Sequence, residues 1–65
     1  MIFRYYCPKR PPKPGAVPYG AIRVGFADSG ILYDEKGHRH KAWGLVEYDH
    51  RLTPQEISYY ELDES

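Results

Sequence analysis

The pair His38 and His40 offers the clearest candidate for metal chemistry in this 65-residue chain. On an extended segment, residues separated by one position project from the same face, so both imidazoles could offer ligands to one ion. A tetrahedral site needs further ligands, and none is supported here by its spacing. The neighbours Lys36, Arg39 and Lys41 also place positive charge where a metal ion would bind. We therefore expect neither a metal nor a cofactor.

Cys7 is the only cysteine, which excludes an internal disulfide and a two-cysteine metal knuckle. A reactive thiolate needs a partly exposed, electropositive site, and Lys9 and Arg10 would supply the charge. No acid is placed to orient a histidine base, however, and a chain of this length encloses too little volume for a substrate. We therefore expect Cys7 to be a small apolar residue at the end of a strand, and the protein not to be an enzyme.

The basic, proline-rich loop at residues 7–18 is the strongest candidate for binding. Its five prolines fix φ near about −65° and remove backbone donors, which makes a stiff, partly extended scaffold for three cations. Pro14-Gly15 suits the central positions of a type II turn. With a further cation and three aromatic residues from outside the loop, the predicted binding residues are Arg4, Lys9, Arg10, Lys13, Tyr6, Tyr19 and Trp43.

Two classes of partner fit these residues. The arrangement P-x-x-P-x-K at Pro8–Lys13 can dock in polyproline II form on an aromatic groove of another protein. One tryptophan, seven tyrosines and two phenylalanines also exceed what so small a core can enclose, and exposed aromatic residues anchor interfaces. The alternative partner is single-stranded nucleic acid, whose phosphates pair with cations while its bases stack on aromatic rings. We favour a protein partner because the chain is not basic overall.

The charges are unevenly divided along the chain. Residues 1–27 carry five basic side chains and no acid, whereas residues 28–65 carry four basic and nine acidic ones. Such asymmetry either marks an interaction surface or lets the two halves neutralise each other within one fold. Reciprocal pairing of the basic and acidic regions about a two-fold axis would also give a homodimer, so self-association is included among the protein partners.

The hydrophobic pattern of the sequence predicts that these residues are positioned by one α+β domain over residues 1–65. We expect a three- or four-stranded, mostly antiparallel sheet from segments 1–6, 19–26, 31–33 and 40–48, with one short helix over 53–62 packed on a face. Thr53, Pro54 and Glu56 form a helix N-terminus with a capping box. Glycine in Asp34–Gly37 suits a hairpin loop. The predicted core is Phe3, Ile22, Val24, Phe26, Ile31, Leu45 or Val46, Leu52, Ile57 and Tyr60.

The first residues carry charge and proline where a signal peptide needs a continuous apolar stretch. No apolar run approaches the roughly 20 residues that a membrane span needs. These features predict a cytoplasmic protein with no membrane partner.

Two segments resemble a known group of proteins. They are RPPKPGAVP at Arg10–Pro18 and AWGLVEYDHRLTPQEISYYEL at Ala42–Leu62. Both are similar to a group of short, uncharacterised bacterial proteins, often encoded near mobile genetic elements. The group has no known activity, so the resemblance implies a small bacterial protein and assigns no role to any residue.

Overall fold

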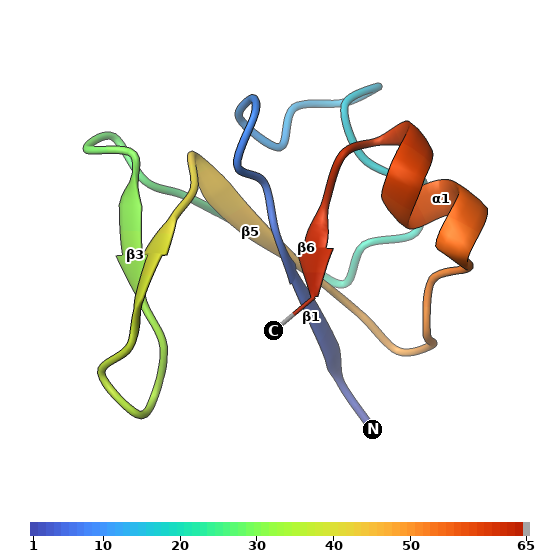
Figure 1. Cartoon of the computed structure of the whole chain (residues 1–65). Coiled ribbons are helices and arrows are strands. Elements are labelled where there is room, and N and C mark those ends of the chain that lie inside the picture. Colours follow the sequence, from blue (N-terminus) through green and yellow to red (C-terminus); the bar gives the residue numbers. More distant parts are fainter. Residues whose placement is uncertain (65) are drawn as a thin grey trace.

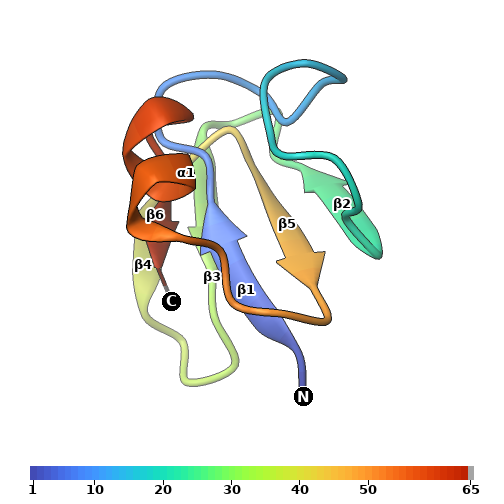
Figure 2. The same ribbon diagram turned by 90° about the vertical axis from the view of Figure 1, so that its right-hand side faces the viewer.

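The computed structural model describes residues 1–64 and has a four-stranded antiparallel sheet at its centre. Figure 1 shows the whole chain, and in Figure 2 the strands lie in the order β2 (Arg23–Phe26), β5 (Gly44–Tyr48), β1 (Phe3–Tyr6) and β6 (Asp63–Glu64). β5 is an inner strand because it pairs with β1 on one side and β2 on the other, and its Val46 and Tyr48 side chains are fully buried. Together with the one short helix, this sheet confirms the predicted α+β fold.

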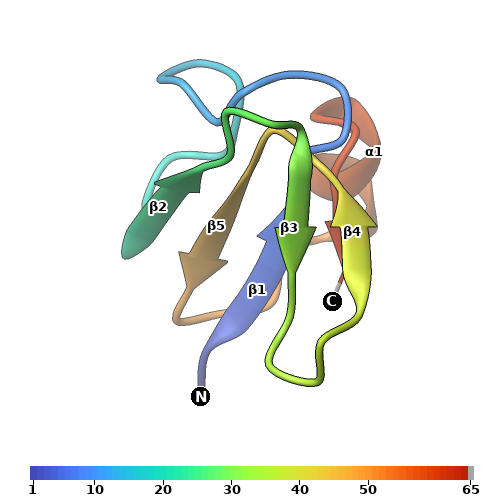
Figure 3. The same cartoon turned by 90° about the vertical axis from the view of Figure 1, so that its left-hand side faces the viewer.

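A second, two-stranded layer covers part of one face of the sheet. β3 (Ile31–Tyr33) and β4 (Arg39–Lys41) pair through the predicted hairpin, in which Gly37 takes a φ of 81°. This β3–β4 ribbon lies on one side of the central sheet and the helix α1 (Pro54–Tyr59) on the other (Figures 1 and 3). The molecule therefore has three layers.

The predicted strand 40–48 is divided in two. Ala42 donates its N–H to the carbonyl of Gly30, whereas the N–H of Trp43 bonds to the carbonyl of Cys7. The backbone of Ala42 is therefore bonded to the ribbon, whereas the backbone of the next residue, Trp43, is already bonded to the central sheet. Local alternation could not show this break, because it depends on partners from distant segments.

The helix begins as predicted. The Thr53 hydroxyl accepts the N–H of Glu56 at 3.1 Å, and the Glu56 carboxylate accepts the N–H of Thr53 at 2.9 Å. The helix ends earlier than expected, at Tyr59, because Glu61 adopts a left-handed φ of 55° and Leu62 donates back to the carbonyl of Ile57. The redirected chain then forms β6, which was not predicted. No helix in residues 1–64 is long and apolar enough to cross a membrane.

The core lies between the central sheet and the α1 layer. Two tyrosines anchor it through their hydroxyls: Tyr5 accepts the N–H of Leu52 at 2.9 Å, and Tyr48 donates to the carbonyl of Pro18. Burial raises the pKa of Tyr48 to about 12, so its hydroxyl remains a donor. The buried residues of this cluster are Tyr5, Cys7, Val46, Tyr48, Leu52 and Leu62, with Phe3, Ile57 and Tyr60 packed against them.

The core prediction was right for the residues under α1 and wrong at β2. Ile22, Val24 and Phe26 are 52%, 42% and 59% exposed, and Ile31 on the ribbon is 36% exposed. The alternation identified the correct face, because Val24 pairs directly with buried Val46. These side chains are exposed because no helix packs over β2: α1 lies at the β6 end of the sheet (Figure 2). Leu45, on the opposite face, is only partly buried.

Candidate functional site

The proline-rich loop is hydrogen-bonded to the central sheet at both of its ends. Cys7 exchanges backbone hydrogen bonds with Gly44 and Trp43, and Pro18 receives the hydroxyl of Tyr48. Between these ends, the N–H of Ala16 bonds to the carbonyl of Lys13 at 2.8 Å with Gly15 at a φ of 89°. These values agree with the predicted type II turn. The loop therefore has a defined shape and forms one wall of a surface feature.

Three arginines of the basic first half bind acids of the second half. Arg4 donates to the Glu47 carboxylate at 2.7 Å, Arg23 lies 3.9 Å from the same carboxylate, and Arg10 donates to Glu61 at 2.5 Å. This pattern favours the interpretation that the two charged halves neutralise each other within one fold. Of the five basic residues, only Lys9 and Lys13 form no ion pair within the part of the chain that the structure describes.

The predicted binding residues do not form one surface. Tyr6 is 2% exposed, and its ring stacks on His40 with 4.1 Å between the centroids. Tyr6 therefore has no ring face open to a partner. Tyr19, which directly follows the loop, is fully exposed, whereas Trp43 lies beside the β3–β4 ribbon. The basic residues are divided in the same way: Arg4 lies near Tyr6 beside the ribbon, and Lys9, Arg10 and Lys13 lie in the loop.

The histidine pair is organised around Asp34. One oxygen of its carboxylate accepts the N–H groups of Lys36 and His38, and the other lies 3.0 Å from Nε2 of His40. The hydrogen bond to His40 is the main reason why the pKa of Asp34 falls from its ordinary 3.8 to about 2. No group of three or more His, Cys, Asp or Glu in residues 1–64 is arranged to hold a metal ion. The cluster thus closes the hairpin turn.

Because the pKa of Asp34 is lower in the folded state, its ionised form stabilises the fold. That contribution is complete above pH 3.8 and is lost as the pH falls toward about 2. We expect Asp34→Asn to remove this part of the acid destabilisation, as measured by urea unfolding between those two pH values. Asp28→Asn, at an exposed acid with no ion pair among residues 1–64, is the control; equal curves for the two variants would contradict the prediction.

Cys7 is a core residue. It is 3% exposed, and burial raises the pKa of its thiol to about 11. A thiol with so high a pKa stays protonated near neutral pH, so it is a poor nucleophile. Its position at the end of β1 agrees with the predicted structural role.

The most distinctive surface feature is an apolar groove between the proline-rich loop and β2, with a volume of about 560 Å³. We call it the β2 groove. None of its lining residues is charged, although 28% of the chain is. The loop contributes prolines, exposed Tyr19 follows directly after it, and the sheet contributes exposed Val24 and Phe26. The lining residues are Pro12, Pro14, Gly15, Val17, Pro18, Tyr19, Gly20, Ala21, Val24, Phe26 and Tyr60.

β2 also forms an open edge of the sheet. It pairs only with β5, and the N–H of Ala27 bonds to the carbonyl of Trp43 in the same ladder. Because hydrogen bonding alternates along an antiparallel pair, the N–H and C=O groups of Val24 and Phe26 point away from β5. The same two residues thus offer apolar side chains to the groove and backbone groups to an incoming strand.

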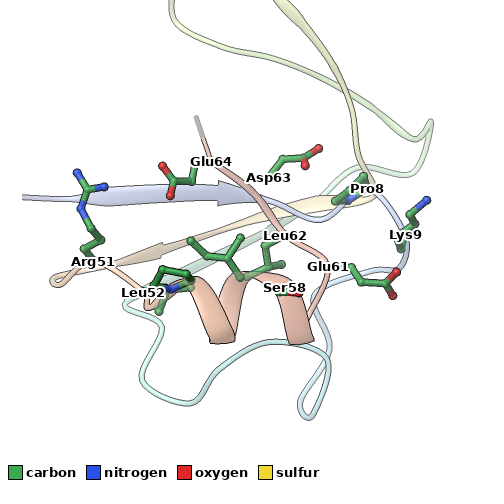
Figure 4. A pocket seen from close by; sticks show the side chains of 11 residues that line it. Pro8, Lys9, Arg51, Leu52, Ser58, Glu61, Leu62, Asp63 and Glu64 are labelled. Atoms are coloured by element: carbon green, nitrogen blue, oxygen red, sulfur yellow. The ribbon is translucent and has the colours of Figure 1, made fainter.

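A second cavity, of about 460 Å³, lies between α1 and β6. Buried Leu52 and Leu62 lie at its centre, and charged side chains of both signs surround them (Figure 4). Glu61 at this rim is the partner of Arg10. The charges around this cavity are of both signs and partly paired. They therefore indicate the chemistry of a partner less clearly than the uncharged lining of the β2 groove does.

The fold and the site define a small α+β domain with an apolar groove beside an open sheet edge. The chain belongs to the family described as defence against restriction A C-terminal, whose model matches residues 1–65. This membership is consistent with the small bacterial domain that the sequence resemblance implied. No curated protein and no solved structure matches the chain.

Proposed function

We propose that this chain is a non-enzymatic protein-docking module whose β2 groove binds an extended, apolar segment of a partner protein. The observation that carries the proposal is the coincidence of two features at Val24 and Phe26. Their side chains are exposed along an uncharged groove, and their backbone groups are free at the sheet edge. An unprotected edge strand of this kind is a template for strand addition.

The chemistry of the groove restricts the partner. A strand added beside β2 would gain main-chain hydrogen bonds from the edge, and its alternate side chains would face the prolines, Val24 and Phe26. A charged side chain would lose water there without gaining an ion pair, because the groove offers none. We therefore expect the partner segment to carry apolar or aromatic residues at every second position.

The family description is compatible with a docking role but does not itself name one. It refers to the C-terminal part of a protein concerned with defence against restriction. A docking domain in that position would attach such a protein to another component of its system. Nucleic-acid binding through Lys9, Arg10 and Lys13, the alternative from the sequence, has weaker support because Arg10 is engaged by Glu61 and neighbouring Tyr6 is interior.

Selection of random peptides against the immobilised domain tests the proposal. We expect selected peptides to alternate apolar residues and to shift the amide NMR resonances of Val24 and Phe26 most strongly. Val24→Lys places a charge on the edge strand, which opposes strand addition, and should weaken peptide binding at least about tenfold.

Ile2→Lys is the matched control, because Ile2 is a similarly exposed aliphatic residue outside the groove. We expect it to bind the peptides normally. Sedimentation of the free domain distinguishes self-association: a dimer broken by Val24→Lys would identify a second copy as the occupant. Peptides that shift resonances elsewhere, or that bind Val24→Lys as well as the unaltered chain, would refute the docking site.

A further inference from the structure

The outward face of the β3–β4 ribbon gathers side chains that the docking function does not use. The pairs Ile31↔Lys41 and Tyr33↔Arg39 alternate with Leu32↔His40. Because directly paired residues share a face, the first two pairs lie on one side of the ribbon and the third on the other. His40 stacks on interior Tyr6, so its side faces the central sheet. The other pairs, which are exposed, face outward.

We call Ile31, Tyr33, Arg39 and Lys41, together with adjacent Trp43, the ribbon face. It contains two cations and no acid. Arg39 and Lys41 form no ion pair within residues 1–64, in contrast to Arg4, Arg10 and Arg23. The two acids of the hairpin turn are otherwise engaged: Asp34 binds His40 and backbone N–H groups, and Glu35 lies 3.8 Å from Arg4.

Trp43 is held in a defined position beside these cations. Its ring packs over Gly30, where a Cβ atom would lie only 3.3 Å from two ring carbons. The ring is nevertheless 43% exposed, and it lines a cavity of about 250 Å³ together with Ile31, Arg39 and Lys41. This volume is slightly below the roughly 300 Å³ at which small-molecule sites usually begin, so the cavity has room for one flat ring system and little more.

We propose that the ribbon face binds single-stranded nucleic acid. Arg39 and Lys41 pair with phosphates, while Trp43 and exposed Tyr33 stack on unpaired bases. Stacking on aromatic rings needs bases with a free face, which a duplex does not offer, so the aromatic content favours a single strand. The contacts follow the backbone and the ring faces, and they predict little sequence preference.

The arrangement of layers keeps this surface apart from the acidic helix layer. The ribbon and α1 lie on opposite sides of the sheet (Figures 1 and 3), and the molecule measures 26 × 24 × 18 Å. Charges on the outermost layers are thus separated by more than the Debye length of about 8 Å at physiological ionic strength. The β2 groove lies on the α1 side of the sheet, so both partners can be bound together.

Titration of a labelled oligothymidylate against the full chain tests the proposal. We expect binding at about 50 mM salt, with an affinity that falls linearly with salt in a log–log plot. Replacing both cations, Arg39→Gln with Lys41→Gln, should weaken binding at least about tenfold and reduce the slope by about 1.4, or about 0.7 for each lost phosphate contact.

The control is Lys9→Gln with Lys13→Gln, which changes the net charge equally on the proline-rich loop. This variant should bind within about twofold of the unaltered chain. Equal losses for the two variants, or no binding at about 50 mM salt, would overturn the proposal. Loss of binding only in the loop variant would instead move the site to the loop and also overturn it.

Trp43 is the only tryptophan, so its fluorescence reports stacking directly. Oligothymidylate should quench it, whereas an abasic phosphodiester of the same length should not and should bind more weakly. Equal affinity for the two polymers without quenching by either would refute base stacking. These readouts are independent of the β2 groove, and Val24→Lys should leave them unchanged.

Discussion

Gly44→Ala should lower the free energy of unfolding by about 3 kcal/mol or more, the upper range for overpacked sites. Gly44 begins β5 at the point where the proline-rich loop crosses the sheet. A Cβ atom there would clash with the carbonyl oxygen of Gly25 and would lie 2.5 Å from Cδ of Pro12. Neither neighbour can rotate away, because one is backbone in a paired strand and the other a rigid ring. The added methyl must therefore displace the loop or separate β2 from β5.

Gly25→Ala is the matched control for this substitution. Gly25 lies in the neighbouring strand, but a Cβ atom there would meet only the Leu45 side chain, at 3.5 Å. We expect this change to cost less than about 1 kcal/mol, as a tolerated substitution. Urea unfolding followed by tryptophan fluorescence measures both. Similar losses for the two variants would show that Gly44 is not the close contact the structure indicates.

Gly44→Ala also tests the architecture of the β2 groove. Pro12 lines the groove and is buried against the sheet. If the methyl group displaces Pro12, the loop wall moves relative to Val24 and Phe26. Peptides selected on the unaltered domain should then bind the folded fraction of the variant more weakly, at a temperature where enough of it remains folded to be measured.

The features that the sequence predicted correctly depend on neighbours in the chain. The capping box of Thr53 and Glu56 and the glycine of the β3–β4 turn are each determined within a few residues. The features that were missed depend on distant segments. β6 exists only because Glu61 turns the chain back along β1, and the break after Lys41 requires carbonyl groups from Gly30 and Cys7.

The candidate site could be predicted only in part from the sequence, because its assembly also depends on distant segments. Composition identified the proline-rich loop, and alternation identified the apolar face of β2. Neither could show that α1 would lie over the other end of the sheet, which converts Val24 and Phe26 from predicted core into the wall of a groove. The shared face of Arg39, Lys41 and Trp43 follows from local alternation, whereas the addition of Ile31 and Tyr33 to that face depends on the pairing of β3 with β4.

The charge asymmetry of the sequence leads to a second large expected effect, at Glu47. Its side chain is 8% exposed, and it lies in β5 directly between Arg4 in β1 and Arg23 in β2. The hydrogen bond to Glu47 is the main cause that raises the pKa of the Arg4 guanidinium, so this group is charged at neutral pH. Removing the carboxylate leaves the positive charges of Arg4 and Arg23 near each other without the acid that lies between them.

Glu47→Gln should therefore reduce the free energy of unfolding by about 3 kcal/mol, the lower end of the range for a broken buried pair. The lower end applies because the Arg4 side chain remains 26% exposed and water can solvate part of its charge. The value would come from urea unfolding near neutral pH, and a cycle with Arg4→Gln would isolate the interaction of the pair.

Glu35→Gln separates the effect of burial from that of charge. Glu35 lies 3.8 Å from the same guanidinium, but its side chain is 88% exposed, so its loss should cost less than about 1 kcal/mol. If the two substitutions destabilise the domain equally, Glu47 is not the central counterion of this sheet. If Glu47→Gln is far more damaging, the opposite charges of the two chain halves act mainly within the fold. The cations available to a partner are then those that form no ion pair within residues 1–64, and these include Lys9 and Lys13 on the loop and Arg39 and Lys41 on the ribbon.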